Sequence, residues 1–250
     1  DRLAADQGVR NGKARVTWWV GRVLLPNKQC RAVMEMKMVG TGDDYTGIPI
    51  SKGCGDAAIQ TSLVDGRPVC IRIVTPADEI RLREGIARMS PRSRYLRFFT
   101  GGASPPDWII ERLLGADGVR HLAWGALDLT DPSQPVMGVV RAIRPGTADP
   151  IAEFSIAVVD AYHGLGVGRL LAATLLLDAF AGGLTAFSAN VLSENEAARS
   201  FIRRLGAHHV SQDGPEAEYR LDVASAVEQM REDRDPPGLA DVFAYFDGKR

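Results

Sequence analysis

One stretch of the sequence, residues 153–183, restricts the fold more than any other. It starts with an apolar run of strand length that contains Phe154 and ends in a short segment with glycine at positions 164, 166 and 168. About four turns rich in Leu and Ala follow, which predicts a helix. A strand, a glycine loop and a helix start direct successive backbone N–H groups at one point, where the helix dipole adds positive charge. The stretch therefore predicts a phosphate-binding loop.

The spacing of the glycines excludes two common nucleotide-binding loops. A dinucleotide fingerprint, Gly-x-Gly-x-x-Gly, needs a third glycine where this chain has Arg169, and residues 184–191 lack the carboxylate that would bind the ribose. A Walker loop needs Gly-Lys-Ser/Thr after the glycines, and that sequence is absent here. The loop must then serve another phosphate-bearing ligand.

The loop resembles the acyl-CoA-binding loop of the GNAT acetyltransferase superfamily, whose pattern is Gln/Arg-x-x-Gly-x-Gly/Ala between a strand and a helix. Here the pattern reads His163-x-x-Gly166-x-Gly168, so that histidine replaces the first residue and the glycines remain. Downstream, residues 193–207 are similar to the family's Asn-x-x-Ala…Leu-Gly-Phe helix. The resemblance covers about residues 67–222. Within it, residues 90–99 are similar to the catalytic domains of bacterial protein-lysine acetyltransferases.

The pattern of strands and helices agrees with the α+β fold that this resemblance implies. Starting signals at Thr75, Ser90 and Ser104 predict helices before the central strands. The mixture predicts a GNAT-like mixed, mostly antiparallel central sheet flanked by helices. Seven segments have the composition of strands: residues 67–74, 119–129, 135–143, 151–159, 184–191, 207–211 and 216–223.

We divide the chain into three parts on composition and motif. Residues 1–66 form an N-terminal segment of uncertain structure, β-rich or irregular, part of which is a possible extension. Residues 67–222 form the GNAT acetyltransferase domain, and residues 223–250 form an acidic C-terminal tail or helix.

Composition narrows the partners and the compartment. A formal net charge of −1 argues against a nucleic-acid-binding protein, because such proteins carry a basic excess. No apolar run reaches the roughly 18 residues of a membrane span, and the N-terminus lacks a signal peptide. Cys30, Cys54 and Cys70 are odd in number and lie outside both motifs, so we expect neither a disulfide framework nor a metal site. These features predict a cytoplasmic protein without nucleic-acid or membrane partners.

The resemblance implies acetyl-CoA as co-substrate and assigns residues to it. In the family, the strand before the loop carries the pantetheine and offers a backbone N–H to the thioester carbonyl. Asn195 has a second interpretation as the N-cap of the next helix, and both can hold. The predicted cofactor-binding residues are Ile156, Val158, His163, Gly164, Leu165, Gly166, Val167, Gly168, Arg169 and Asn195.

Glu153 is the candidate general base. An acceptor ammonium group has a pKa near 10, so a base must take its proton before acetyl transfer. Glu153 lies near the start of an apolar strand, where burial would raise a carboxylate pKa, and it matches the glutamate base of the lysine acetyltransferases. A solvent-facing carboxylate at the strand end is the alternative. Ile202 replaces the family's usual general acid, a tyrosine, which leaves water, Tyr162 or Ser193 to protonate the thiolate.

Charge is distributed unevenly along the chain. Residues 67–99 contain an excess of arginines, which we interpret as a solvated helix face, with contact to a CoA phosphate as the alternative. Beyond Gln212 the composition is acidic. These acids form either a solvated tail or the border of an acceptor pocket for a cation.

The leading prediction is an acetyl-CoA-dependent N-acetyltransferase that acts on a primary amine of a polycationic small molecule, such as an aminoglycoside antibiotic. The acidic C-terminal segment favours it, because several carboxylates can pair with several ammonium groups. A protein-lysine N-acetyltransferase is the alternative, which residues 90–99 favour. A non-catalytic acyl-CoA-binding regulator is a third hypothesis, based on the departures at His163 and Ile202. A homodimer is one possible assembly.

Overall fold

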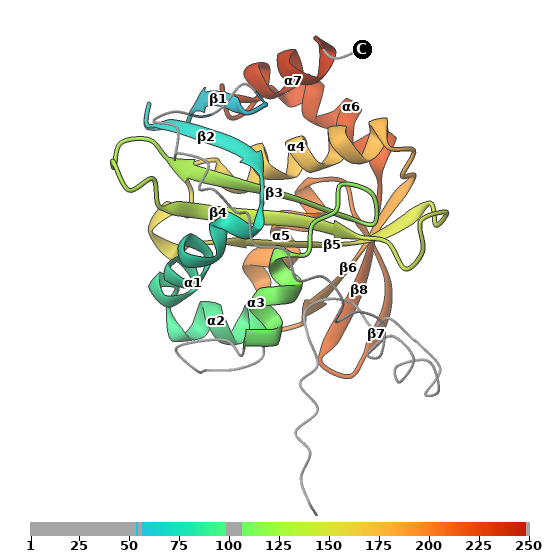
Figure 1. The fold of residues 1–250 in the computed structure, drawn as a ribbon. Helices are drawn as coiled ribbons and strands as arrows, with labels where there is room; N and C mark the ends of the chain where they lie inside the picture. Colours follow the sequence, from blue (N-terminus) through green and yellow to red (C-terminus); the bar gives the residue numbers. More distant parts are fainter. Residues whose placement is uncertain (1–53, 55–56, 99–106, 249–250) are drawn as a thin grey trace, which may run out of the picture.

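The computed structural model describes residue 54, residues 57–98 and residues 107–248 (Figure 1). Most of the N-terminal segment predicted over residues 1–66, including Cys30, lies outside the described residues. Within the described ranges, no helix is both long enough and apolar enough to cross a membrane.

A single eight-stranded sheet runs through the described part of the chain in the order β1-β2-β3-β4-β5-β6-β8-β7. Every neighbouring pair is antiparallel except β5 and β6, which are parallel. This arrangement confirms the mixed, mostly antiparallel sheet that the sequence predicted. The strands are β1 (Ile59–Ser62), β2 (Pro68–Ile73), β3 (His121–Asp128), β4 (Val136–Ile143), β5 (Ile151–Val158), β6 (Ala186–Leu192), β7 (His208–Asp213) and β8 (Glu216–Asp222).

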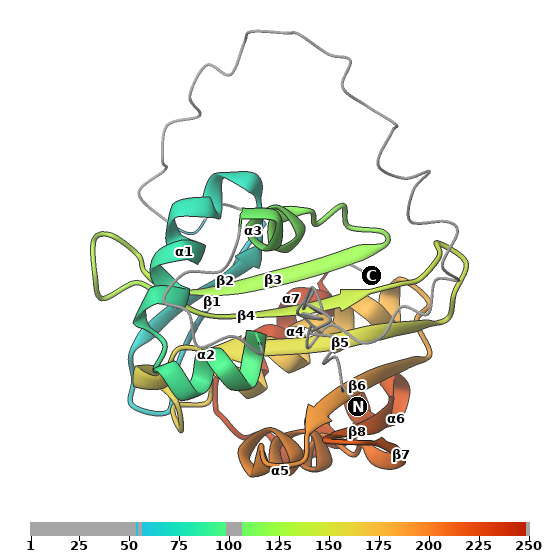
Figure 2. The same cartoon turned by 90° about the horizontal axis from the view of Figure 1, so that it is seen from below.

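Helices cover both faces of this sheet (Figures 1 and 2). On one face lie α1 (Glu79–Arg88), α2 (Pro91–Phe98) and α3 (Asp107–Leu114). On the other lie α4 (Val167–Ala181), α6 (Val223–Asp233) and α7 (Leu239–Asp247). The remaining helix, α5 (Glu196–Arg204), joins β6 to β7, and two short 3-10 turns, η1 (Pro76–Asp78) and η2 (Asp160–Tyr162), precede α1 and α4.

Coverage of both faces explains the composition of the central strands. Every residue of β3 is buried, and such a strand reads as a continuous apolar run because neither face meets water. Along α4, side chains such as Leu171 and Leu175 have no exposed surface. Burial of each such leucine stabilises the fold by about 1.5–3 kcal/mol.

The parallel pair of strands separates after a short contact. Residues Ile151–Glu153 of β5 pair with residues Ala186–Ser188 of β6, yet β5 runs on to Val158 and β6 to Leu192. Beyond Glu153, the edge of β5 that faces β6 therefore has no partner strand among the residues that the structure describes. In Figure 2 the two strands diverge toward the end where α4 begins.

The acidic C-terminal part folds as two packed helices. Asp222 caps α6 by accepting a hydrogen bond from the Ser225 N–H at 2.8 Å. Val242 of α7 is fully buried, and Asp241 accepts a hydrogen bond from the Thr61 hydroxyl of β1 at 2.6 Å. The segment is thus docked against α4 and β1, and the interpretation as a solvated tail does not hold for residues 223–247.

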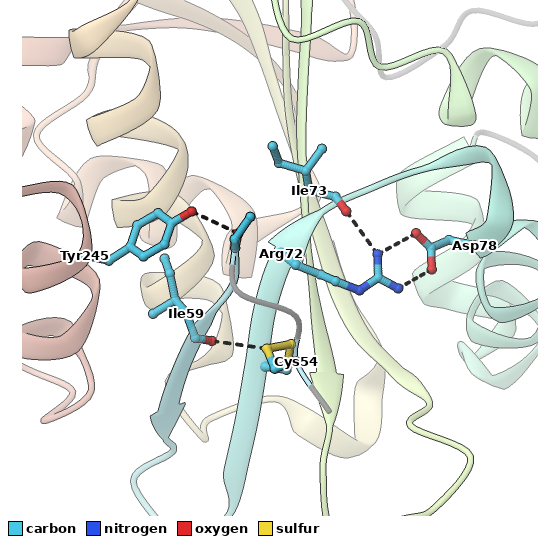
Figure 3. The surroundings of a disulfide bond; sticks show 8 residues. Cys54, Ile59, Arg72, Ile73, Asp78 and Tyr245 are labelled. Carbon is cyan, nitrogen blue, oxygen red and sulfur yellow. Dashed lines mark hydrogen bonds and ion pairs between the residues drawn. A yellow bond between two sulfur atoms is a disulfide. The ribbon is translucent and has the colours of Figure 1, made fainter. Parts of the chain in front are cut away.

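Cys54 and Cys70 form a disulfide, so the expectation of no disulfide is wrong (Figure 3). Their Cα atoms lie 5.7 Å apart, within the range that a disulfide needs. An odd number of cysteines does not exclude one bridge, and the β1–β2 pairing brings the chain ahead of β1 back beside β2. Cysteine usage therefore gives no support for a reducing compartment, and the cytoplasmic location stays a prediction.

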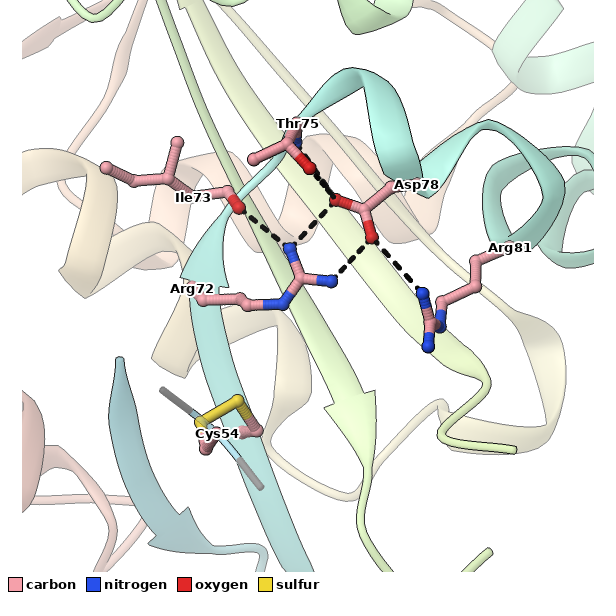
Figure 4. Close-up of polar contacts among 7 residues, drawn as sticks. Cys54, Arg72, Ile73, Thr75, Asp78 and Arg81 are labelled. Carbon is pink, nitrogen blue, oxygen red and sulfur yellow. Dashed lines mark hydrogen bonds and ion pairs between the residues drawn. A yellow bond between two sulfur atoms is a disulfide. The ribbon is translucent and has the colours of Figure 1, made fainter. Parts of the chain in front are cut away.

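A polar cluster around Asp78 fixes the first helix to the sheet (Figure 4). The Asp78 carboxylate accepts hydrogen bonds from the Thr75 N–H at 2.9 Å and from Arg72 of β2 at 2.8 Å, and Arg81 lies 3.7 Å away. Burial alone would raise the Asp78 pKa, but these donors hold it below its usual range. The helix start predicted at Thr75 is confirmed.

Candidate active site

A cleft of about 780 Å³ opens where β5 and β6 separate. Its walls come from the ends of these two strands, the glycine loop, α2, α5 and the segment between α6 and α7. The volume lies within the usual range for a small-molecule site, about 300–1,000 Å³. Of the predicted cofactor-binding residues, all except Leu165 line this cleft.

The glycine loop has the backbone geometry of an anion site. Gly164 and Gly166 have φ values of +77° and +91°, a region that side chains other than glycine rarely adopt. A Cβ atom on Gly166 would lie 2.9 Å from Pro236 Cγ. None of the N–H groups from Gly164 to Gly168 donates to a backbone carbonyl of the described residues. Free N–H groups at the start of α4 can bind an anion, as the sequence predicted.

The histidine that departs from the family pattern connects the loop to the end of β5. His163 Nε2 lies 2.9 Å from the Val158 carbonyl oxygen, so this nitrogen carries the proton of the hydrogen bond. The ring itself is exposed. The Leu165 carbonyl accepts a hydrogen bond at 3.2 Å from the N–H of Val64, a residue that lines the cleft.

Other predicted cofactor residues take part in contacts within the fold. Gly168 lets α4 approach α5, because a Cβ atom there would lie 3.3 Å from Phe201 Cε2. Arg169 pairs with Asp233 at the end of α6. The Asn195 side chain accepts a hydrogen bond from the Ala198 N–H at 3.1 Å, which confirms the N-cap, and the same residue lines the cleft. Its contact with a cofactor stays a prediction.

Glu153 is not among the lining residues of this cleft but precedes the lining residue Phe154, at the last position where β5 pairs with β6. Its side chain is 9% exposed, which excludes the solvent-facing alternative, and its Oε1 atom has no hydrogen-bond partner within the described ranges. Burial raises the Glu153 pKa to about 7, against the opposing charges of Arg112 and Arg97. A carboxyl group with this pKa can accept a proton near neutral pH.

The buried position of Arg97 shows that the arginine-rich stretch, residues 67–99, is not wholly a solvated helix face. The side chain extends from α2 into the protein, is 7% exposed, and donates from Nη2 to the Ser155 hydroxyl at 3.3 Å. Burial lowers the Arg97 pKa to about 10, while the nearby Glu153 acts in the opposite direction. The sequence carries no local signal of this position, because packing decides which helix face is covered.

Asp160 is a second residue at the site that the sequence did not indicate. Its carboxylate accepts hydrogen bonds from the Ser90 N–H at 2.9 Å, from the Ser90 hydroxyl at 2.9 Å and from the Ser93 hydroxyl at 2.6 Å. Burial would raise the Asp160 pKa, but these donors lower it. The contacts confirm the helix start at Ser90 and fix α2 relative to the turn that leads into the glycine loop.

None of the three positions considered for protonating the leaving thiolate both lines the cleft and has a hydroxyl without another partner. Ile202 is buried on the cleft wall where the family has tyrosine. Tyr162 lines the cleft, but its hydroxyl donates to Asp128 at 3.2 Å. The Ser193 hydroxyl accepts a hydrogen bond from Gln212 at 2.9 Å, and Ser193 does not line the cleft. Water is the donor that these positions leave.

Residues 97–207 match the model of the Acetyltransferase (GNAT) family. Acetyltransferase Pat of Mycolicibacterium smegmatis is 33% identical over 147 residues, which are 57% of this chain and 42% of that protein. Acetyltransferase PA5475 of Pseudomonas aeruginosa is 28% identical over 152 residues, 61% of this chain and 81% of that protein. The crystal structure of the GNAT domain of S. lividans PAT has a TM-score of 0.62 and 23% identity, and covers 67% of this chain and 98% of that one.

These similarities coincide with the site. The matched residues 97–207 include Glu153, the glycine loop and Asn195, and the likeness to the S. lividans domain confirms the fold. The chain spans less than half the length of the M. smegmatis relative. Residues 97–207 belong to the acetyltransferase (GNAT) family, and the chain therefore contains a GNAT acetyltransferase domain.

Proposed function

We propose that this chain transfers the acetyl group of acetyl-CoA to the side-chain amine of a protein lysine. The observation that carries the proposal is the buried Glu153, whose pKa of about 7 suits a base, next in sequence to Phe154 of the cleft that the glycine loop bounds.

The cleft fits acetyl-CoA. The N–H groups of residues 164–168 suit its pyrophosphate, and the unpaired edge of β5 beyond Glu153 suits the amide groups of its pantetheine arm. Arg92, Arg169 and Arg204 line the same cleft and add positive charge for the phosphates. Acetyl-CoA supplies an acyl group on a thiolate leaving group, whose conjugate acid has a pKa near 8.5.

The proton steps follow from these positions. Glu153 is not part of the cleft wall, although the next residue, Phe154, is, so we propose that Glu153 takes the lysine proton through one water molecule. The neutral nitrogen then attacks the thioester carbonyl carbon, the C–N bond forms and the C–S bond breaks. The nitrogen loses its second proton, and water protonates the thiolate because Ile202 cannot.

The positions of the acidic residues favour a lysine over a polycationic small molecule. Two of the C-terminal acids have other partners, since Asp241 accepts from Thr61 and Asp247 pairs with Arg231, and of these C-terminal acids Asp235 alone lines the cleft. Asp160 is held by two serines. The similarity to acetyltransferase Pat and the resemblance of residues 90–99 to protein-lysine acetyltransferases support the same acceptor.

Free-thiol release from acetyl-CoA tests the proposal, with lysine-containing proteins and an aminoglycoside panel as parallel acceptors. We expect turnover with protein, acetyl-lysine in the product by mass spectrometry, and a loss of about 10²-fold or more in kcat for Glu153→Gln. Glu196→Gln is the control, because Glu196 is an exposed carboxylate on α5. Turnover with aminoglycosides alone would overturn the lysine acceptor. Binding of acetyl-CoA without turnover on either acceptor would instead indicate the acyl-CoA-binding regulator.

A further inference from the structure

Two buried arginines meet on the face of the sheet that α1, α2 and α3 cover. Arg141 of β4 lies directly opposite Ser155 of β5, and directly opposite residues of an antiparallel pair share a face. Arg97 of α2 donates to the hydroxyl of the same Ser155. The two guanidinium groups are therefore neighbours, and each lowers the stability of the other's charge.

Arg141 has unsatisfied hydrogen-bonding groups. The residue is 3% exposed, and neither Nη1 nor Nη2 has a hydrogen-bond partner in the described part of the chain. Burial and the charge of Arg97 both lower the Arg141 pKa. A buried charge is normally paired, because removing it from water without compensation costs several kcal/mol.

Both arginines line one cavity of about 40 Å³. The rest of its lining is apolar, with Leu82, Ile86 and Phe98 among the side chains, and no carboxylate is among its lining residues. By the same measure one water molecule needs about 10–15 Å³, so the cavity exceeds a single water site. Water could satisfy the N–H groups, but it would leave the charge uncompensated and would find few partners on the apolar walls.

We propose that this cavity binds one small monovalent anion, of the size of chloride or a carboxylate group, between Arg97 and Arg141. Arg141 provides the two free N–H donors, and Arg97 provides the second positive charge. The apolar side chains exclude larger or strongly hydrated anions.

The proposed anion site adjoins the candidate active site without belonging to it. Met89, Arg97 and Ala157 line both the cavity and the cleft, and Glu153 lines neither of them. Binding of the anion does not depend on the proposed acetyl transfer, and the test therefore uses binding alone.

Bromide provides a direct test on the unmodified full chain. Crystals soaked in sodium bromide should show an anomalous peak between the Arg97 and Arg141 guanidinium groups. Absence of a peak there, with peaks at surface sites in the same crystals, would overturn a halide site. Formate is the second arm, and density for formate in place of bromide would identify the natural ligand as a carboxylate group.

Thermal unfolding provides an independent test in solution. At constant ionic strength, replacement of gluconate by chloride or formate should raise the Tm by about 2–4 °C if the anion reaches several times its Kd. Arg141→Met should abolish this increment, whereas Arg203→Met, an exposed arginine of α5, should keep it. The readout is the increase in Tm that the anion causes. A variant can therefore be compared with wild type even if its Tm without the anion is different. Equal increments in wild type and Arg141→Met would contradict the proposal.

Discussion

Both faces of the sheet are buried, but the side chains buried on the two faces differ in polarity and charge. On the face under α4, contacts are apolar apart from isolated bonds such as Trp124 Nε1 to Asp178 at 2.7 Å. On the face under α1–α3, the protein buries Arg97, Arg141 and Glu153, and burial shifts the pKa of each toward its neutral form. Burial of apolar side chains on the first face stabilises the fold, whereas burial of charged side chains on the second face costs stability. The difference locates the functional chemistry on the second face.

The largest effect on the fold should come from the α4 face. Leu175→Ala removes a fully buried side chain and leaves a cavity, so we expect a loss of about 2–5 kcal/mol in the free energy of unfolding. Urea denaturation measures this loss, and the kcat of the folded fraction should stay within about twofold of wild type. Phe180→Ala, on the exposed part of the same helix, is the control. A large fall in kcat with unchanged stability would contradict the division between the two faces.

The pH dependence of activity tests the other face. A base must be ionised, so kcat/KM should rise about tenfold per pH unit below the Glu153 pKa of about 7 and level off above it. Between pH 5 and pH 7 the rise should reach about 10²-fold. Initial rates in buffers of constant ionic strength measure it, and Glu153→Gln should lose this limb. A wild-type profile that is flat over that range would exclude Glu153 as the base.

A glycine of the loop should affect binding more than stability. Gly166→Ala places a Cβ atom at a φ of +91° and 2.9 Å from Pro236, and it moves the backbone N–H groups of the loop. We expect the KM for acetyl-CoA to increase about tenfold, at a stability cost of about 1–2 kcal/mol.

Gly183→Ala is the matched control for this change. Gly183 has a φ of +73°, but a Cβ atom there would contact nothing within 4 Å, and it lies at the far end of α4. It should lose similar stability and keep the wild-type KM. An equal rise in KM for both variants would show that the loop has no special role.

The smallest expected effect is a gain in stability. The Glu153 pKa is about 7 in the folded chain and 4.5 in its ordinary state, so the contribution of Glu153 to stability is fully present below pH 4.5 and is lost as pH rises through 7. At pH 8 the ionised carboxylate remains buried, and Glu153→Gln removes that cost. The variant should therefore have a Tm a few degrees above wild type at pH 8 and a similar Tm at pH 4. If Glu153→Gln instead has a lower Tm than wild type at pH 8, the ionised Glu153 carboxylate must be stabilised by a partner in the wild-type chain.

Local patterns predicted helices and strands from β2 onward and identified the glycine loop and Glu153 as candidates, but they did not predict β1. The glycine spacing predicted the loop, and the capping residues Thr75, Ser90 and Asn195 predicted helix starts that the structure confirms. Each of these signals acts over a few residues of chain. Glu153 was also identifiable, because a carboxylate within an apolar strand is unusual.

The remaining features depend on contacts between distant segments. Arg141 follows five apolar or small residues in β4, and nothing near it indicates whether water or α2 covers that face. The Cys54–Cys70 bridge depends on the path of the chain ahead of β1. The hydrogen bond between Thr61 and Asp241 docks α7 on β1, and these two residues lie 180 positions apart in the sequence. Sequence periodicity carries no information on such pairs.

The separation of β5 from β6 leaves the sheet incomplete at its centre. Among the strands that the structure describes, residues 154–158 of β5 have a neighbour on the β4 side and none on the β6 side. A ligand with amide groups can occupy that edge as a strand would, so we expect the acetyl donor to act as a removable part of the architecture. Amide hydrogen exchange at residues 154–158 should slow when CoA binds and return to its former rate when CoA leaves. In each catalytic cycle, binding of the acetyl donor would complete the sheet at this edge, and release of CoA would leave the edge unpaired again.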